Sequence, residues 1–309
     1  MGKTYLPEGQ LLRTEENAQY TASLEGLEYA KEKGIILEAR VIMCDSFHNL
    51  HVDLGEYRGI IPKDEALYVP TGEPVKDIAV ITRVGKSVCF MVTDIVNDGG
   101  NVKVMLSRKL AQRECCESYI NLLDSGDVID VMVTHLERFG AFCDIGCGYI
   151  ALLPVDCISV SRISHPSERF ENGQLIKCVV KSIDRQTSRV TLTHKELLGT
   201  WEENAAYFAP GETVSGIVRS IESYGIFVEL APNIAGLAEW CDDVTAGCCV
   251  AVYIKSIIPE KMKIKLAIVD VSSDIEHPAS YGYFFEGSHL DVWWYSPKGC
   301  TKQIFTEFD

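Results

Sequence analysis

The chain has 309 residues, 47% of them apolar, and carries 29 basic against 44 acidic side chains, which gives a formal net charge of −15. No apolar run approaches the roughly 18 residues that a membrane helix needs, and the N-terminus MGKTYLPEGQ lacks the basic patch and apolar stretch of a secretion signal. We therefore expect a soluble, cytoplasmic protein that contacts no membrane. The acidic excess argues against strong nucleic-acid binding, because Lys and Arg normally neutralise the phosphates.

The twelve cysteines predict neither zinc binding nor disulfides. No CxxC pair occurs, and Cys143 and Cys147 are four residues apart on a predicted strand and loop. We expect reduced, mostly buried thiols that behave as small hydrophobic side chains, with no metal site and no cofactor.

The N-terminal residues 1–33 are expected to form a helical brace. One helix is predicted over 15–33, because Thr14 suits the N-cap, Tyr20 and Leu27 share a face with Leu24, and Gly34 can end it.

From Ile35 onward apolar residues recur with period two, which predicts three modules of five short strands. The modules span 34–110, 124–195 and 210–270. The predicted strands are 36–44, 49–54, 57–61, 77–84 and 102–106 in the first module, 128–136, 139–145, 149–153, 175–183 and 189–193 in the second, and 214–221, 225–230, 234–238, 249–257 and 263–268 in the third.

Helical spacing returns between the modules, which predicts helical linkers at 111–123 and 196–209, with Thr193 and Glu196 spaced as a capping box. The tail, 271–309, holds nine of the 28 aromatic residues. It predicts a β-hairpin of 290–295 and 301–308 around the turn Ser296-Pro297-Lys298-Gly299. We expect its rings to pack on the third module, and the alternative is a separate patch that docks a partner.

A short strand pattern occurs three times: a ring, two residues, a second ring, then apolar, acidic and apolar residues. The copies begin at His48, Phe139 and Tyr224, so successive copies are 91 and 85 residues apart (139 minus 48 and 224 minus 139). This spacing is the length of a small domain and predicts one module used three times.

Strand alternation separates an inner from an outer face in the second module. The residues expected inside are Cys143, Ile145, Val190 and Leu192, and those expected outside are Phe142, Asp144 and Arg189.

An outward ring beside an arginine suits the stacking of nucleic-acid bases, whereas the ordinary alternative for a strand Phe is the core. The alternation favours stacking for Phe142 and Phe227 and leaves both readings open for Phe139 and Tyr224. Gly140 permits a bulge that would turn Phe139 outward.

Basic residues follow the last two strands of the second module. Lys177 and Lys181 share one strand face, Arg185 and Arg189 come next, and Lys195 follows the fifth strand. This series predicts phosphate contacts, and the alternative is a solvated polar face.

The second module resembles the S1 RNA-binding domain of the ribosomal protein S1 family, a five-stranded OB-fold barrel. The resemblance rests on Phe139-Gly140-Ala141-Phe142, Ile183-Asp184 and Arg189-Val190-Thr191-Leu192-Thr193-His194-Lys195. It covers the second module along its full length, the third over 211–266, and the first loosely. It implies an all-β chain of three tandem OB barrels with helical connectors, an N-terminal helix and a C-terminal aromatic hairpin.

The family implies a single-stranded RNA surface made by two rings on strand two, a His ending strand three, and an Asp and an Arg around the turn before strand five. The residues implied for RNA binding are Phe139, Phe142, Asp184 and Arg189 in the second module, Tyr224, Phe227 and Lys263 in the third, and His48 and His51 in the first, beside Lys177, Lys181 and Lys195. Pro62, Pro154 and Glu239 stand where the family has the His, and Ile258 stands where the third module would have the Asp.

The sequence therefore favours a non-catalytic protein that binds single-stranded mRNA in bacterial translation, with the small ribosomal subunit as a further partner. An alternative is an adaptor whose acidic third module and tail dock on a basic surface of the ribosome or the transcription machinery. Enzyme activity has no residue constellation to support it: Gly85-Lys86-Ser87 lacks the earlier Gly of a phosphate loop, since position 80 is Val80.

Overall fold

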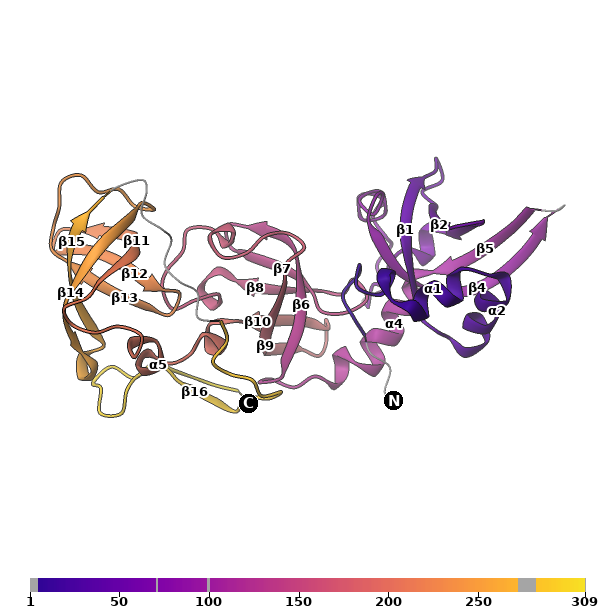
Figure 1. Cartoon of the computed structure of the whole chain (residues 1–309). Helices are drawn as coiled ribbons and strands as arrows, with labels where there is room; N and C mark the ends of the chain where they lie inside the picture. Colours follow the sequence, from indigo (N-terminus) through magenta and orange to yellow (C-terminus); the bar gives the residue numbers. More distant parts are fainter. Residues whose placement is uncertain (1–4, 71, 99–100, 272–281, 309) are drawn as a thin grey trace. The chain divides into compact units, whose positions relative to one another are not determined.

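The computed structural model describes residues 5–70, 72–98, 101–271 and 282–308 (Figure 1). The first residues of the predicted brace, 1–4, and residues 272–281 of the predicted tail lie outside the described residues. The chain divides into two compact units. The first unit comprises 1–123, 143–151 and 183–190, and the second comprises 124–142, 152–182 and 191–309.

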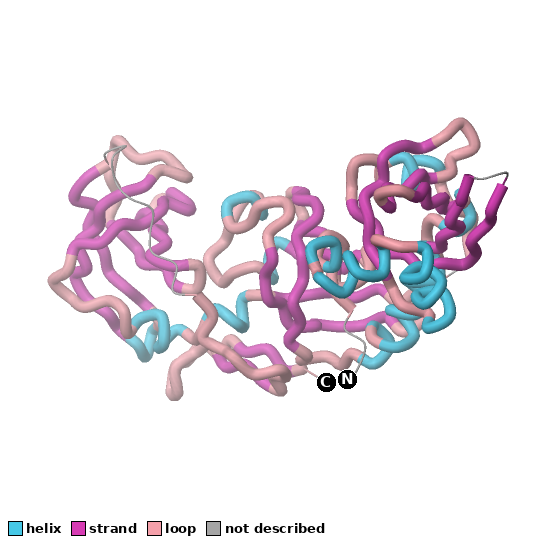
Figure 2. The backbone as a smooth tube through the Cα atoms, turned by 45° about the vertical axis from the view of Figure 1, so that its right-hand side comes forward, coloured by secondary structure: helices cyan, strands magenta, loops and turns pink. Residues whose placement is uncertain are grey.

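Strands dominate the chain, with short helices between them (Figure 2). They form three closed five-stranded barrels, in each of which the third strand pairs in parallel with the fifth. This order is that of the OB fold and confirms the predicted fold class. The strands are β1 Leu37–Cys44, β2 Leu50–Leu54, β3 Tyr57–Ile61, β4 Ser87–Asp98 and β5 Asn101–Ser107 in the first barrel, β6 Val128–Glu137, β7 Gly140–Asp144, β8 Ile150–Pro154, β9 Leu175–Asp184 and β10 Arg189–Thr193 in the middle barrel, and β11 Thr213–Glu222, β12 Gly225–Ala231, β13 Ile234–Ala238, β14 Cys249–Ile258 and β15 Lys263–Asp270 in the third.

The predicted fourth strand of the first module, 77–84, is wrong. Residues Asp77–Ile81 form the short helix α3, and the strand follows it as β4. A brief apolar run fits a strand or a buried helical turn equally well, and here Val80 faces the core while Ile78 and Ile81 remain exposed.

The predicted N-terminal helix is two helices, α1 Glu15–Thr21 and α2 Leu24–Lys33. Ser23 caps the second helix by accepting a hydrogen bond from the Gly26 N–H, so that α2 begins as a separate helix after α1 ends. Gly26 also lets the helices approach closely, because a Cβ there would lie 2.6 Å from the Tyr20 carbonyl oxygen. Leu27 and Ala30 of α2 are buried in the core of the first barrel.

The first connector is helical, with α4 at Arg108–Ser118, and the second contains two short helical segments separated at Gly199. A short 3₁₀ helix covers Lys195–Leu198, Gly199 adopts a left-handed φ of 82°, and α5 spans only Trp201–Ala205. The capping box belongs to Thr200 and Glu203. Thr193 and Glu196 instead bond to each other through their side chains at 2.5 Å.

The inward residues predicted for the middle barrel, Cys143, Ile145, Val190 and Leu192, are all buried. Asp144, which was expected outside, is buried as well. Its carboxylate accepts hydrogen bonds from the backbone N–H groups of Glu8, Gly146 and Gly148 at 2.8, 2.9 and 3.0 Å. The N-terminal segment therefore covers a position that strand alternation alone assigns to solvent.

The tail ends in a hairpin, β16 Val292–Trp294 and β17 Phe305–Glu307, which is shorter than predicted. Trp293 and Tyr295 join the core of the third barrel, as expected. Other tail rings do not: Tyr283, Phe285 and Phe308 pack with Val179 of β9 and Leu197 of the second connector.

All twelve cysteines lie among the described residues and are free thiols, eight of them buried. Among the residues that the structure describes, no helix combines the length and apolarity needed to cross a bilayer.

Candidate nucleic-acid interface

Two pairs of rings with the same geometry mark the middle and third barrels. Phe139 is 56% exposed and meets Phe142 edge to face, with ring centroids 5.8 Å apart and planes at 87°. Tyr224 is 68% exposed and meets Phe227 at 6.2 Å and 88°. Edge-to-face contact is a preferred aromatic geometry. It holds the outer ring of each pair in place while leaving much of its surface in solvent.

The outer rings are those that immediately precede strands β7 and β12, whereas the alternation favoured Phe142 and Phe227. A glycine explains the difference in both copies. A Cβ on Gly140 would lie 2.4 Å from the Leu153 carbonyl oxygen, and a Cβ on Gly225 would lie 2.6 Å from that of Ala238. Only glycine permits this close approach of neighbouring strands, and the ring that precedes it, just before the strand begins, is exposed.

His135 extends the ring pair of the middle barrel and escaped the sequence analysis. It lies on β6, is exposed, and stacks on Phe142 with centroids 6.3 Å apart and planes at 21°. Its Nε2 lies 2.9 Å from a carboxylate oxygen of Glu137. Its position on the outer face of a strand was the available signal, but the contact with Phe142 is visible only in the folded structure.

The third barrel has a different additional ring, Trp240, which is also exposed and also escaped the sequence analysis. Trp240 lies two residues beyond the end of β13, whose last residue, Ala238, pairs with Ile226 of β12. The neighbouring Glu239 bonds to the Lys255 ammonium at 2.6 Å, and this bond lowers the pKa of its carboxyl. The acid that replaces the family's His is thus paired with a cation.

Among the described residues of the first barrel, no comparable ring pair occurs. His48 lies before β2 in a left-handed turn with φ of 62°, half-buried, and its Nδ1 is 3.6 Å from an Asp77 oxygen. The His51 Nε2 is 3.2 Å from an Asp45 oxygen. Each of these two histidine rings has a carboxylate beside it, and the negative charge of that carboxylate would repel an RNA phosphate.

Asp184 and Arg189 flank the turn between β9 and β10, in the first unit. The Asp184 carboxylate accepts hydrogen bonds from the Thr187 hydroxyl at 2.6 Å and the Gln186 N–H at 2.9 Å. These bonds lower the pKa of Asp184, so the residue holds the turn as a charged cap. Arg189 is exposed at the start of β10.

The predicted lysines Lys177 and Lys181 are exposed and Lys195 is half-buried, and all three ammonium groups have a neighbouring partner. Lys177 pairs with Asp130 at 3.1 Å, the Lys181 ammonium lies 3.2 Å from the Cys157 sulfur, and that of Lys195 lies 3.5 Å from the Asp156 carbonyl. Lys263 of the third barrel is also exposed. Exposed pairs of this kind are weak, so phosphate could displace them at little cost.

Comparison with known proteins matches residues 123–195 to the S1 RNA-binding domain family. The small ribosomal subunit protein bS1 of Staphylococcus aureus is 33% identical over 238 residues, which is 75% of this chain and 56% of the relative. The bS1 homolog of Bacillus subtilis is 34% identical over 194 residues, 61% of this chain and 48% of the relative. The chain therefore spans about half the length of the curated relatives that it matches.

Among solved structures, a multidomain protein with nucleic acid binding domains from Streptococcus pneumoniae is 13% identical, with a TM-score of 0.24. The match covers 78% of this chain and 75% of that one. A similarity this low carries no argument about function.

Proposed function

Because the chain belongs to the family of proteins that contain S1 RNA-binding domains, we propose that it is a non-catalytic protein that binds single-stranded RNA through its middle and third barrels. The observation that carries the proposal is the repeated pair of rings, in which Phe139 and Tyr224 each present an exposed face held by a second ring. Every base has a π-face, so such a surface binds RNA with little dependence on sequence.

The finer proposal is that the RNA is mRNA, that the small ribosomal subunit is a partner, and that the protein works in the bacterial cytoplasm, where translation occurs. The bS1 relatives support it, as they are proteins of the small ribosomal subunit.

The adaptor alternative depends on acidic residues that a basic partner could reach. Two acidic residues of the third barrel, however, already pair with basic side chains of this chain. Glu229 is buried and accepts hydrogen bonds from Arg169 at 2.6 Å and from Arg219 at 2.7 Å. Glu239 is paired with Lys255. Their engagement supports RNA binding over docking by charge.

The double substitution Phe142→Ala, Arg189→Ala is expected to weaken binding of a labelled single-stranded RNA by about tenfold or more, because stacking on one aromatic contributes on the order of 1–3 kcal/mol. Fluorescence anisotropy at low salt measures the change. Tyr29→Ala, which removes an exposed ring on α2, is the matched control and should bind as the wild type does. Equal affinities for the wild type and the double variant would refute the proposal.

Raising the salt concentration is expected to weaken RNA binding. The protein has a net charge of −15, and the few cations near its rings contact RNA phosphates through interactions that salt screens. Affinity that stays constant across a salt series would contradict the contribution of the phosphate contacts. The contribution of stacking would still be tested by the double variant.

Trp240→Ala is expected to weaken binding about fivefold for RNA long enough to reach the third barrel, since one stacking partner is lost. Val155 serves as the control, because it follows Pro154 in the middle barrel as Trp240 follows Glu239 in the third. Val155→Ala should leave the affinity unchanged. Unaltered binding by Trp240→Ala would remove Trp240 from the interface.

A further inference from the structure

The C-terminal hairpin carries a second aromatic surface, separate from the ring pairs of the barrels. Trp293 and Trp294 are consecutive on β16 and therefore point to opposite faces. Trp293 is 5% exposed in the core of the third barrel, whereas Trp294 is 52% exposed. The β16–β17 register pairs Trp294 with Phe305, and their rings stack with centroids 4.6 Å apart. Core packing accounts for Trp293 and leaves Trp294 unexplained.

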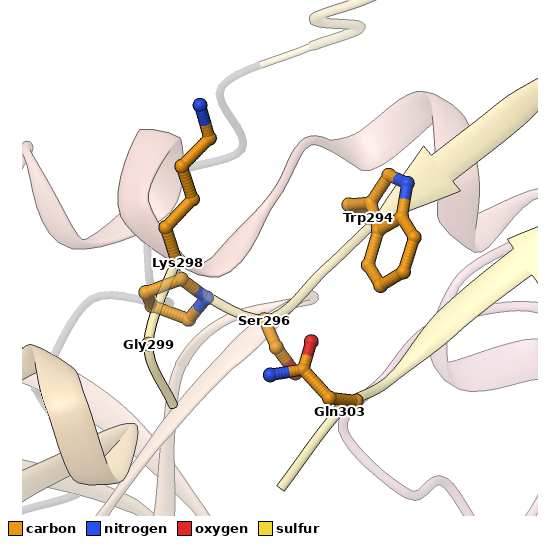
Figure 3. A pocket seen from close by; sticks show the side chains of 6 residues that line it. Trp294, Ser296, Lys298, Gly299 and Gln303 are labelled. Carbon is orange, nitrogen blue, oxygen red and sulfur yellow. The ribbon is translucent and has the colours of Figure 1, made fainter. Parts of the chain in front are cut away.

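A pocket of about 430 Å³ lies between Trp294 and the turn of the hairpin, lined also by Ser296, Pro297, Lys298, Gly299 and Gln303 (Figure 3). Hydrogen bonds join the two ends of this turn. The Ser296 hydroxyl donates to the Lys302 carbonyl and accepts from the Ile304 N–H, each at 2.8 Å. The pocket is therefore shaped by the hairpin backbone as well as by side chains that could rearrange.

Polar groups in the pocket are placed for a ligand with a ring, a polar edge and a negative charge. Figure 3 shows Trp294 and Lys298 on opposite sides of the pocket with the Gln303 amide between them. Gln303 donates one hydrogen bond to the Cys300 carbonyl. Within the described residues its amide oxygen accepts none, and Lys298 forms no ion pair.

The charge of the tail points to the same ligand. Residues 272–309 contain two lysines and six acidic residues, and both lysines, Lys298 and Lys302, fall in this one turn. An acidic segment that gathers its cations beside an exposed tryptophan is complementary to a phosphate attached to a planar base. A peptide would need the apolar face without requiring a cation there.

We propose that this hairpin pocket binds one nucleotide of single-stranded RNA. The base stacks on Trp294, the Gln303 amide bonds to its polar edge, and the Lys298 ammonium contacts the phosphate. The inference rests on the proposed RNA-binding function and adds a contact outside the barrels.

The test uses the full chain and oligouridylates of two lengths, one short enough to occupy the barrels alone and one longer. Trp294→Leu and Lys298→Gln are each expected to weaken binding of the longer RNA about fivefold and to leave the short RNA unaffected. Lys298→Gln alters only an exposed turn, so it tests the proposal even if Trp294→Leu disturbs the hairpin. Tyr29→Leu, which removes another exposed and stacked ring, should change neither affinity.

Ultraviolet crosslinking followed by mass spectrometry locates the contact directly. A uridine attached to the peptide that contains Trp294 and Lys298 supports the site. Crosslinks confined to the barrels, together with unchanged affinity of both hairpin variants, would overturn it, leave RNA binding by the barrels intact and assign the pocket to another class of ligand. A wild-type protein that binds neither RNA would overturn the proposed function itself, and the pocket proposal with it.

Discussion

Replacing Arg108 by methionine is expected to lower the free energy of unfolding of the first unit by about 3–5 kcal/mol, because it leaves a buried carboxylate without its partner. Arg108 is 2% exposed, and its Nε and Nη2 donate to the Glu8 carboxylate at 2.7 and 3.0 Å. Burial acts to raise the pKa of Glu8, but the guanidinium prevails and lowers it. Glu8 is therefore charged in the folded protein.

The surroundings would make an unpaired Glu8 costly. Burial, together with the charge of Glu8, raises the pKa of Glu38 and that of Asp144 to about 7. The Glu8 carboxylate in this cluster is compensated by Arg108, more distantly by Arg83 at 3.9 Å, and by the Cys89 N–H, which donates to it at 3.1 Å. The space is closed as well, since a Cβ on Gly148 would lie 2.1 Å from the Arg108 Nη2.

Denaturant unfolding and hydrogen exchange measure this effect together. The amides of Gly9, Leu11 and Leu12 bond to the Glu38 carboxylate, so their exchange should accelerate when the N-terminal segment is released. The control is the double variant Glu8→Gln, Arg108→Met, which removes both charges and should recover part of the loss. A single variant within about 1 kcal/mol of the wild type would show that the pair does not hold this segment.

The barrels could be predicted from the sequence because their signal is local. Period-two alternation and the repeat place fourteen of the fifteen barrel strands correctly, to within a few residues at their ends. The exception, 77–84, is a short apolar run that helix and strand accommodate equally well. The break between α1 and α2 also escaped prediction, although Ser23 at its N-cap and Gly26, which approaches Tyr20 closely, both mark it.

The candidate interface was predicted only in part, since its remaining members depend on register and on distant contacts. The spacing of the rings indicated Phe139 and Tyr224 with their partners, but His135 comes from another strand. The acid of the repeated pattern shows the limit most clearly. Asp53 is exposed. The Asp144 carboxylate accepts a hydrogen bond from the backbone N–H of Glu8, 136 residues away, and the Glu229 carboxylate accepts one from the Arg169 side chain, 60 residues away.

The repeated acid therefore has no common function in RNA binding. In the middle barrel it holds the N-terminal segment, and in the third it accepts hydrogen bonds from two half-buried arginines. Only the rings and the glycine between them are used alike in these two barrels. The seven-residue pattern looks uniform in the sequence. It combines a ring pair, whose geometry the middle and third barrels share, with an acidic residue whose surroundings differ in each copy.

Acid is expected to destabilise the second unit through His194, by about 3 kcal/mol between pH 6.5 and pH 4. His194 is 6% exposed, its Nδ1 donates to the Ile158 carbonyl at 3.0 Å, and its ring meets Phe170 and Tyr283 edge to face. Burial, together with the positive charge of Arg169 and against the carbonyl bond, lowers the pKa of His194 to about 4.

The direction follows from the protons bound in each state. An unfolded histidine titrates near pH 6.5, so between pH 6.5 and pH 4 the unfolded chain binds a proton that folded His194 refuses. The stabilisation is complete above pH 6.5, is lost as the pH falls through this window, and changes no further once both states are protonated.

Comparison of the wild type with His194→Leu isolates this group from the carboxylates that titrate over the same range. The difference in free energy of unfolding between the two proteins, measured in denaturant from pH 7.5 to pH 4, should shift by about 3 kcal/mol in favour of the variant as the pH falls. Parallel curves for the wild type and His194→Leu would mean that the buried ring accepts its proton without cost, most simply by leaving the cluster of Phe170 and Tyr283. In that event hydrogen exchange at pH 4 would show the Ile158 region opening before the barrels unfold.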